Sequence, residues 1–292
     1  FLLVSFYFIR KYFSGGFAAL FIILLAFSPL NMAMARRALT ESMYCLFSVL
    51  SLWLFLDYIK EDSNLKRILF VLVFTFTILI KETAALLCIF FTIFLVFRKF
   101  FQKKEVKLKD FLFCSFLPLA IVFILYASLG GLTNTINIMA MIIRSSTSNL
   151  YAITYGSGPW YRYLIDYLII SPPVTLLGTG FIFHYLCLRR EKASDVIDYF
   201  LLFFIFILVA FSFFHKNIRY VINLDIVFRI FSLLILTEIS KQVSKNKYGI
   251  LLAGLVIAIA LWDITNFSRL FLVHGIYDPV TLKLLRAEQI IL

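Results

Sequence analysis

The chain is built from long apolar runs separated by short polar loops, and this alternation constrains its fold more than any other feature. A bilayer core of ~30 Å is crossed by ~20 helical residues, whose backbone polar groups are satisfied within each helix. The pattern predicts an all-α fold, a polytopic transmembrane helical bundle with about nine to ten transmembrane segments. The runs fall at about 1–9, 17–30, 43–59, 66–80, 83–97, 110–129, 161–188, 196–214, 220–240 and 248–265.

The composition agrees with a membrane protein and excludes other classes. Of the 292 residues, 62% are hydrophobic, which is more apolar surface than a soluble domain needs. The net charge of +12 arises in short loops between the runs, so membrane topology explains it and we expect no nucleic-acid partner. The cysteines lie in apolar runs without a C-x-x-C pair and no ligand cluster is visible, so the sequence names no metal site.

The distribution of basic residues predicts the orientation of the segments. Loops 60–67 and 98–109 are both rich in Lys and Arg, which is typical of cytoplasmic loops. An even number of crossings must then separate them, so Lys81 and Glu82 are expected at the outer tip of a helical hairpin. Continuing the alternation places a group of charged residues on the same outer face, namely Arg36, Arg37, Glu41, Arg162, His215, Lys216 and Arg219.

Several cations at one membrane face suit an anionic headgroup. Arg offers paired donors to phosphate, Lys offers a point charge, and a carboxylate among them can assist proton transfer. Ordinary roles also fit these residues: snorkelling side chains, an ion pair at a hairpin tip, a solvated turn and an aromatic belt. Asp225 and Arg229 stand four residues apart within one run, which favours an intrahelical ion pair.

Four motifs occur in a particular order along the chain: "SPLNMAMARRALTES", "LIKETAALL", "GPWYRYLIDYLIISPP" and "HKNIRYVI". Together they resemble the integral-membrane glycosyltransferases of the GT-C superfamily. The likeness is to the branch with protein O-mannosyltransferases, aminoarabinose transferases and RgtA/B/C/D-like enzymes. Glu41 stands where that family usually has Asp. The matching positions are Ser28-Pro29, Arg36 or Arg37, Glu41, Lys81-Glu82, Gly158-Pro159, Tyr161, Ser171-Pro172 and Arg219-Tyr220.

The resemblance implies a hexosyl- or pentosyltransferase. Its donor would be a polyprenyl-phosphate-linked sugar, its acceptor a glycan, lipid or protein, and its surroundings the lipid of a bacterial inner (plasma) membrane with the active site on the outer face. No cofactor beyond the donor is implied. Glu41 would be an auxiliary catalytic carboxylate. The implied substrate-binding residues are Arg36, Arg37, Lys81, Glu82, Tyr161, His215, Lys216, Arg219 and Tyr220.

The resemblance also bears on the start of the chain. Phe1 opens inside an apolar run, so we interpret residues 1–292 as a single domain that lacks its first helix and first outer loop. In the family that loop holds the main carboxylate. We therefore expect these 292 residues alone not to catalyse transfer.

Two other functions stay open. A polysaccharide polymerase or ligase would carry a long outer loop rich in Arg and His, whereas loop 130–160 has only Arg144. A flippase or transporter of lipid-linked sugar would place ionisable groups near the membrane midplane, where Asp225 and Arg229 are the candidates.

Overall fold

The computed structural model describes residues 1–36, 40–148, 158–188, 194–214, 217–244 and 246–273. Across these ranges every regular element is a helix, which confirms the all-α prediction. The chain forms two compact units. The first contains residues 1–42 and 155–292, and the second contains residues 43–154. The prediction of one domain over 1–292 stays a prediction.

The first unit is organised around one helix that is buried along most of its length. This helix, α14, begins at Asn223, and every residue from 223 to 233 is buried. It packs against α2, α12, α13 and α15. The described helices of this unit are α1 (Leu2–Tyr12), α2 (Gly15–Ala26), α3 (Pro29–Arg36), α11 (Arg162–Ile170), α12 (Pro172–Leu188), α13 (Asp195–Ser212), η4 (Ile218–Val221), α14 (Asn223–Val243), α15 (Tyr248–Phe267) and the π-helical η5 (Ser268–Val273).

Two Ser-Pro pairs separate consecutive helices of the first unit. Proline lacks an N–H and disfavours helical backbone at the residue before it, so the earlier helix ends before the serine and a new helix starts at the proline. The helices α2 and α3 meet at a bend of 56°, at the Ser-Pro pair that ends run 17–30. Run 161–188 becomes α11 and α12, with the break at Ser171. Both breaks place a serine hydroxyl inside the unit, because Ser28 and Ser171 are fully buried.

A cluster of buried charges joins these breaks to α14 and α15. The Arg229 guanidinium donates to Asp225 at 2.9 Å, lies 2.9 Å from Asp263 of α15, and donates to the Leu24 carbonyl at 2.7 Å. This confirms the predicted Asp225–Arg229 pair within one helix. The Ser171 hydroxyl donates to Asp263 at 2.6 Å. The cluster therefore connects four segments that are far apart in the sequence.

The first Ser-Pro break reaches the same cluster through Asn31. The Asn31 amide donates to Asp225 at 2.7 Å and to the Ser28 hydroxyl at 3.1 Å. The Asn31 backbone N–H also donates to Ser28, at 3.2 Å, so this serine satisfies an N–H in the first turn of α3. Both polar breaks are thus bonded to one buried charge network.

Gly178 of α12 allows α12 and α14 to approach closely, since a Cβ there would lie 2.7 Å from the Phe228 ring and 3.1 Å from the Phe228 carbonyl oxygen. Small residues permit such contacts between membrane helices. We expect Gly178→Ala to lower the free energy of unfolding by about 1–3 kcal/mol through overpacking. The matched control is Gly180→Ala, where nothing lies within 4 Å. Thermal unfolding in detergent would test this, and equal midpoints for both variants would contradict it.

The second unit is a helical assembly with a core of phenylalanine rings. Phe91 contacts Phe55, Phe70 and Phe74, with ring centroids 4.3, 5.2 and 5.1 Å apart. The elements are α4 (Thr40–Glu61, whose first turn belongs to the first unit), α5 (Asn64–Ile80), η1 (Glu82–Ala85), α6 (Leu86–Phe100), α7 (Leu108–Phe111), the π-helical η2 (Leu112–Phe116), α8 (Leu117–Gly130) and α9 (Leu132–Ser148).

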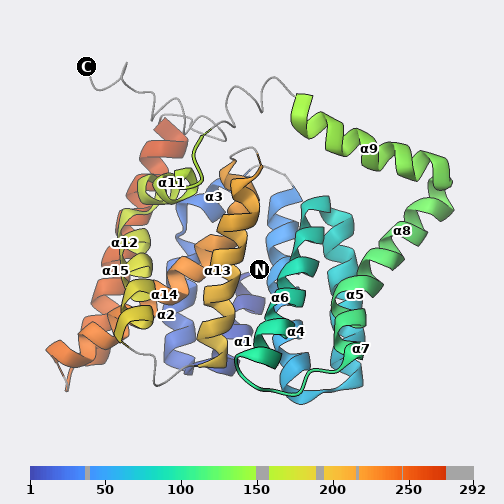
Figure 1. The fold of residues 1–292 in the computed structure, drawn as a ribbon. Helices are drawn as coiled ribbons and strands as arrows, with labels where there is room; N and C mark the ends of the chain where they lie inside the picture. Colours follow the sequence, from blue (N-terminus) through green and yellow to red (C-terminus); the bar gives the residue numbers. More distant parts are fainter. Residues whose placement is uncertain (37–39, 149–157, 189–193, 215–216, 245, 274–292) are drawn as a thin grey trace. The chain divides into compact units, whose positions relative to one another are not determined.

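The predicted hairpin at Lys81-Glu82 is present. Lys81 has extended backbone, with φ −152° and ψ 115°, and ends α5. The helices α5 and α6 then run in opposite directions (Figure 1), and Phe70 and Phe74 of α5 meet Phe91 of α6. The charged pair therefore lies at the turn that was predicted from the two basic loops.

The described helices include five that are long and apolar enough to cross a membrane, or six if the bent pair α2–α3 forms one span. This indicates an integral membrane protein. The prediction of nine to ten spans is not confirmed by these helices. Part of the difference arises because the Ser-Pro breaks shorten single helices below the length of a full span.

Candidate functional site

Glu41 and Arg219 come together within the first unit. Glu41 lies in the first turn of α4, and Arg219 lies in the short helix η4. One Arg219 guanidinium nitrogen, Nη1, is 3.6 Å from Glu41 Oε1. The Glu41 side chain is 7% exposed and that of Arg219 is 23% exposed. A buried carboxylate thus lies beside a cation that still reaches the surface.

The backbone of η4 presents Arg219 through a cap made by Asn217. The Asn217 side-chain oxygen accepts hydrogen bonds from the Arg219 backbone N–H at 3.1 Å and from Arg219 Nε at 3.4 Å. Asparagine is a favoured residue at this position because its short side chain reaches the first free N–H groups of a helix. The same amide therefore starts the helix and restrains the base of the guanidinium.

The helix α11 lies beside η4 in the first unit. The Tyr163 hydroxyl accepts a hydrogen bond from the Asn217 backbone N–H at 3.3 Å, and the Tyr167 hydroxyl donates to the Val221 carbonyl at 2.6 Å. Both tyrosines are almost fully buried. Two side chains one helical turn apart therefore contact the residues on either side of Arg219.

Arg162 and Asp166 form a buried pair on the same helix. Their side chains are 4% and 1% exposed, and Arg162 Nε lies 3.8 Å from an Asp166 carboxylate oxygen. Gly158, just before α11, has a φ of +151°, and a Cβ there would lie 2.9 Å from Arg162 Cδ. Asp166 was not singled out by the sequence analysis. The spacing of four residues from Arg162 is the signal that indicates it.

The other predicted site residues of the first unit that the structure describes are exposed or only partly buried. Arg36 is exposed at the end of α3. Tyr161, just before α11, is 46% exposed and its ring meets that of Trp160 edge-on. Tyr220 is partly buried and stacks on Phe211 with centroids 6.0 Å apart. Arg37, His215 and Lys216 lie outside the described residues.

Lys81 and Glu82 belong to the second unit, and their described contacts lie there. Lys81 is 8% exposed, with Nζ 5.1 Å from the centroid of the Tyr44 ring, which is within range of a cation–π interaction. Glu82 is exposed and lines a mainly apolar pocket of about 330 Å³ between α5, α8 and α9. Lys81 and Glu82 therefore both lie at the turn between α5 and α6, the first buried and the second exposed.

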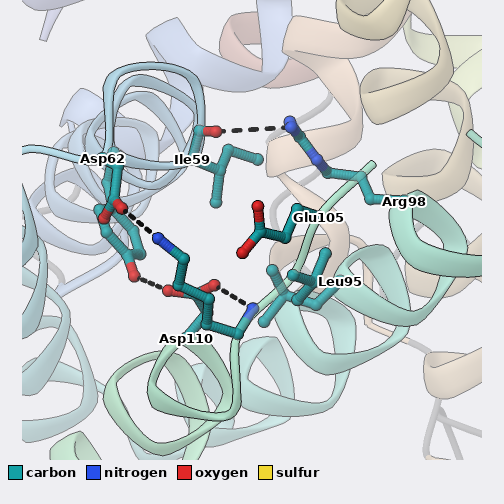
Figure 2. A pocket seen from close by; sticks show the side chains of 9 residues that line it. Ile59, Asp62, Leu95, Arg98, Glu105 and Asp110 are labelled. Atoms are coloured by element: carbon teal, nitrogen blue, oxygen red, sulfur yellow. Dashed lines mark hydrogen bonds and ion pairs between the residues drawn. The ribbon is translucent and has the colours of Figure 1, made fainter. Parts of the chain in front are cut away.

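A second pocket of the same unit, of about 190 Å³, lies at the C-terminal ends of α4 and α6 (Figure 2). Asp62, with φ +38°, receives hydrogen bonds from Lys107 and Lys109, which lower the pKa of its carboxyl. Tyr58 donates to Asp110, and Arg98 donates to the Ile59 carbonyl. Because its charged groups bind one another, we interpret this pocket as the closure of the basic loop 98–109 and not as a reaction centre.

Metal ligands do not gather in the part of the chain that the structure describes. No group of three or more His, Cys, Asp or Glu side chains in those ranges has an arrangement that could hold a metal ion.

Comparison with known proteins finds a family that resembles the first part of the chain. Residues 1–127 match the family model described as dolichyl-phosphate-mannose-protein mannosyltransferase. The matched segment holds the Ser28-to-Glu41 motif and the Lys81-Glu82 motif, and the two later motifs lie beyond it. No curated protein and no solved structure matches the chain. The match supports the GT-C resemblance for this part of the chain.

Proposed function

We propose that this protein is a membrane glycosyltransferase that transfers a sugar from a polyprenyl-phosphate-sugar donor to an acceptor at the outer face of the membrane. The observation that carries the proposal is the meeting of Glu41 and Arg219 at 3.6 Å. These residues come from two motifs far apart in the sequence, and only the first lies in the segment that resembles mannosyltransferases. A hexosyl donor such as a polyprenyl-phosphate mannose fits that resemblance best.

The chemistry needs a cation for the leaving group. An acceptor hydroxyl attacks the anomeric carbon, the bond from that carbon to the phosphate oxygen breaks, and the polyprenyl phosphate leaves with the electron pair. Arg219 is suited to bind this phosphate, because its guanidinium offers several fixed donors and reaches the surface. Its link to Glu41, at 3.6 Å, is longer than a tight hydrogen bond, so a phosphate can compete for the guanidinium.

The acceptor must lose a proton as it attacks. Glu41 is the auxiliary carboxylate of this proposal, and it orients the acceptor hydroxyl and shares its proton beside the phosphate. Arg36 and the predicted residues Arg37, His215 and Lys216 are proposed as further phosphate or sugar contacts. Tyr161 and Tyr220 are proposed to border the sugar. Lys81 and Glu82, in the second unit, are proposed as substrate-binding residues from the sequence resemblance alone. The proposal places these groups at the outer face of a bacterial plasma membrane.

A transport function gains no support from the charged pair that it would use. Asp225 and Arg229 are buried against Asp263, Asn31 and the Leu24 carbonyl. Groups bonded to one another in this way hold helices together, whereas a transport pathway needs ionisable groups that a substrate or a proton can reach.

Binding of the lipid phosphate tests the proposal. Purified full-length protein in lipid nanodiscs is titrated with undecaprenyl phosphate and, separately, with the neutral alcohol undecaprenol. We expect Arg219→Ala to weaken binding of the phosphate by about 30-fold, the loss of a charge-assisted contact, and to leave binding of the alcohol unchanged.

The matched control is Lys241→Ala, which removes an exposed cation from the last turn of α14. It should bind both lipids as the wild type does. Equal affinity of the wild type for the phosphate and the alcohol, or an Arg219→Ala variant with unchanged phosphate affinity, would overturn the proposed site.

A further inference from the structure

The turn that carries Arg219 is held at both ends by a single helix. Asn217 precedes η4 and Val221 ends it, and these residues bond to Tyr163 and Tyr167 of α11 at 3.3 and 2.6 Å. The two tyrosines lie one helical turn apart, so they face the same side of α11. Their hydroxyls bracket the turn, with Arg219 between the two contacts.

These two hydrogen bonds act on the backbone of the turn, and their effect reaches the Arg219 guanidinium through Asn217. The Asn217 N–H is bonded to Tyr163, while its side-chain oxygen accepts from the Arg219 N–H and Nε. The position of Asn217 therefore sets the direction in which the Arg219 side chain leaves the turn. Because α11 is itself fixed by packing, with the Tyr167 ring 5.1 Å from Phe228 of α14, the restraint is connected to the core of the unit.

We propose that Tyr163 and Tyr167 are positioning residues, and that this tyrosine clamp (Tyr163 and Tyr167) together with Asn217 holds Arg219 in the orientation that binds a phosphate headgroup. The inference rests on the proposed function, since it assigns a purpose to the orientation of Arg219. It also relates two motifs that are far apart in the sequence, "GPWYRYLIDYL" and "HKNIRYVI". The first motif supplies the clamp and the second supplies the group that is clamped.

The alternative is a purely structural role, in which the tyrosines only satisfy buried backbone groups. The two readings differ in what the loss of a hydroxyl changes. A structural role predicts lower stability with unaltered preference for the headgroup. A positioning role predicts a loss of preference for phosphate over alcohol, because only the phosphate depends on the direction of the guanidinium.

The test measures that preference in the full-length protein, with undecaprenyl phosphate and undecaprenol as probes. Tyr163→Phe and Tyr167→Phe each remove one hydroxyl and keep the ring. We expect each to weaken binding of the phosphate by about tenfold, with no change for the alcohol. Asn217→Ala should behave in the same way, while Asn217→Ser, which keeps an oxygen able to cap the turn, should restore most of the affinity.

Two comparisons make the result decisive. Tyr185→Phe removes a hydroxyl that donates to Asp198 at 2.9 Å, between α12 and α13, and it should leave the headgroup preference unchanged. Adding Arg219→Ala to Tyr163→Phe should weaken binding little beyond Arg219→Ala alone, because both changes remove the same contact. Amide hydrogen exchange at residues 217–221 should be faster in the Tyr163 and Tyr167 variants than in wild type. Faster exchange there would show that the turn has been released.

The experiment distinguishes failure of the tyrosine clamp from failure of the proposed function. If Arg219→Ala weakens phosphate binding while Tyr163→Phe and Tyr167→Phe keep the wild-type preference, the clamp is wrong and the proposed function stands. If Arg219→Ala itself leaves phosphate binding unchanged, the proposed function fails and the clamp fails with it as a device for binding phosphate.

Discussion

Replacing Arg229 with methionine is expected to lower the free energy of unfolding by about 3–5 kcal/mol, the cost of leaving buried charges without their partner. The guanidinium is fully buried, and it lies 2.9 Å from each of two buried carboxylates, Asp225 and Asp263. Without it, two like charges remain inside the unit. This loss approaches the whole stability of an ordinary domain, so the variant should yield little folded protein.

Chemical unfolding in detergent micelles measures this effect, with Asp263→Asn as the matched comparison. That change removes one of the two negative charges and keeps an oxygen that can accept from Ser171, so its cost should be about 1 kcal/mol. A triple variant, Arg229→Met with Asp225→Asn and Asp263→Asn, removes every charge of the cluster and should regain part of the lost stability. A stable Arg229→Met protein would contradict the assigned role of the cluster.

Glu41→Gln is expected to reduce the rate of sugar transfer by about 100-fold, at the lower end of what the loss of a proton-transfer group causes. The amide keeps the shape of the carboxylate but cannot take the acceptor's proton. Binding of undecaprenyl phosphate should not weaken, because the change removes a negative charge that competes for Arg219. The expected result is therefore a lower kcat with an unchanged or tighter donor affinity.

Turnover and binding are measured on the same preparation, so that misfolding is separated from lost chemistry. The control is Glu105→Gln, which removes an exposed carboxylate from the basic loop 98–109 and should leave transfer unchanged. A Glu41→Gln variant with wild-type turnover would remove Glu41 from the reaction and leave its pairing with Arg219 as a structural contact.

The helical class and the hairpin at Lys81-Glu82 could be predicted from the sequence because they follow from local signals. Apolar runs indicate segments that cross the lipid bilayer, and basic loops indicate which side of the membrane a loop faces. The break at Ser171-Pro172 inside run 161–188 was not predicted, since hydropathy does not register a proline at the end of one helix and the start of the next. The Ser-Pro breaks account for part of the difference between the predicted and the observed count of spans.

The candidate site was predicted in part. The shared face of Glu41 and Arg219 followed from the alternation of loops, and the structure adds their contact at 3.6 Å. The roles of Tyr163, Tyr167 and Asn217 could not be predicted, because each depends on a backbone group of a distant segment. Asp263 was missed for a similar reason: no spacing within its own run indicates which face meets Arg229.

The most direct test of the account is release of polyprenyl phosphate by the full-length protein in lipid. Donors would include dolichyl-phosphate mannose and undecaprenyl-phosphate mannose, with the label in the sugar and wild type compared with Glu41→Gln and Arg219→Ala. We expect wild type to release the lipid phosphate from at least one donor and both variants to lose this release while remaining folded. Folded wild-type protein that binds no lipid phosphate and releases none from any donor would contradict it.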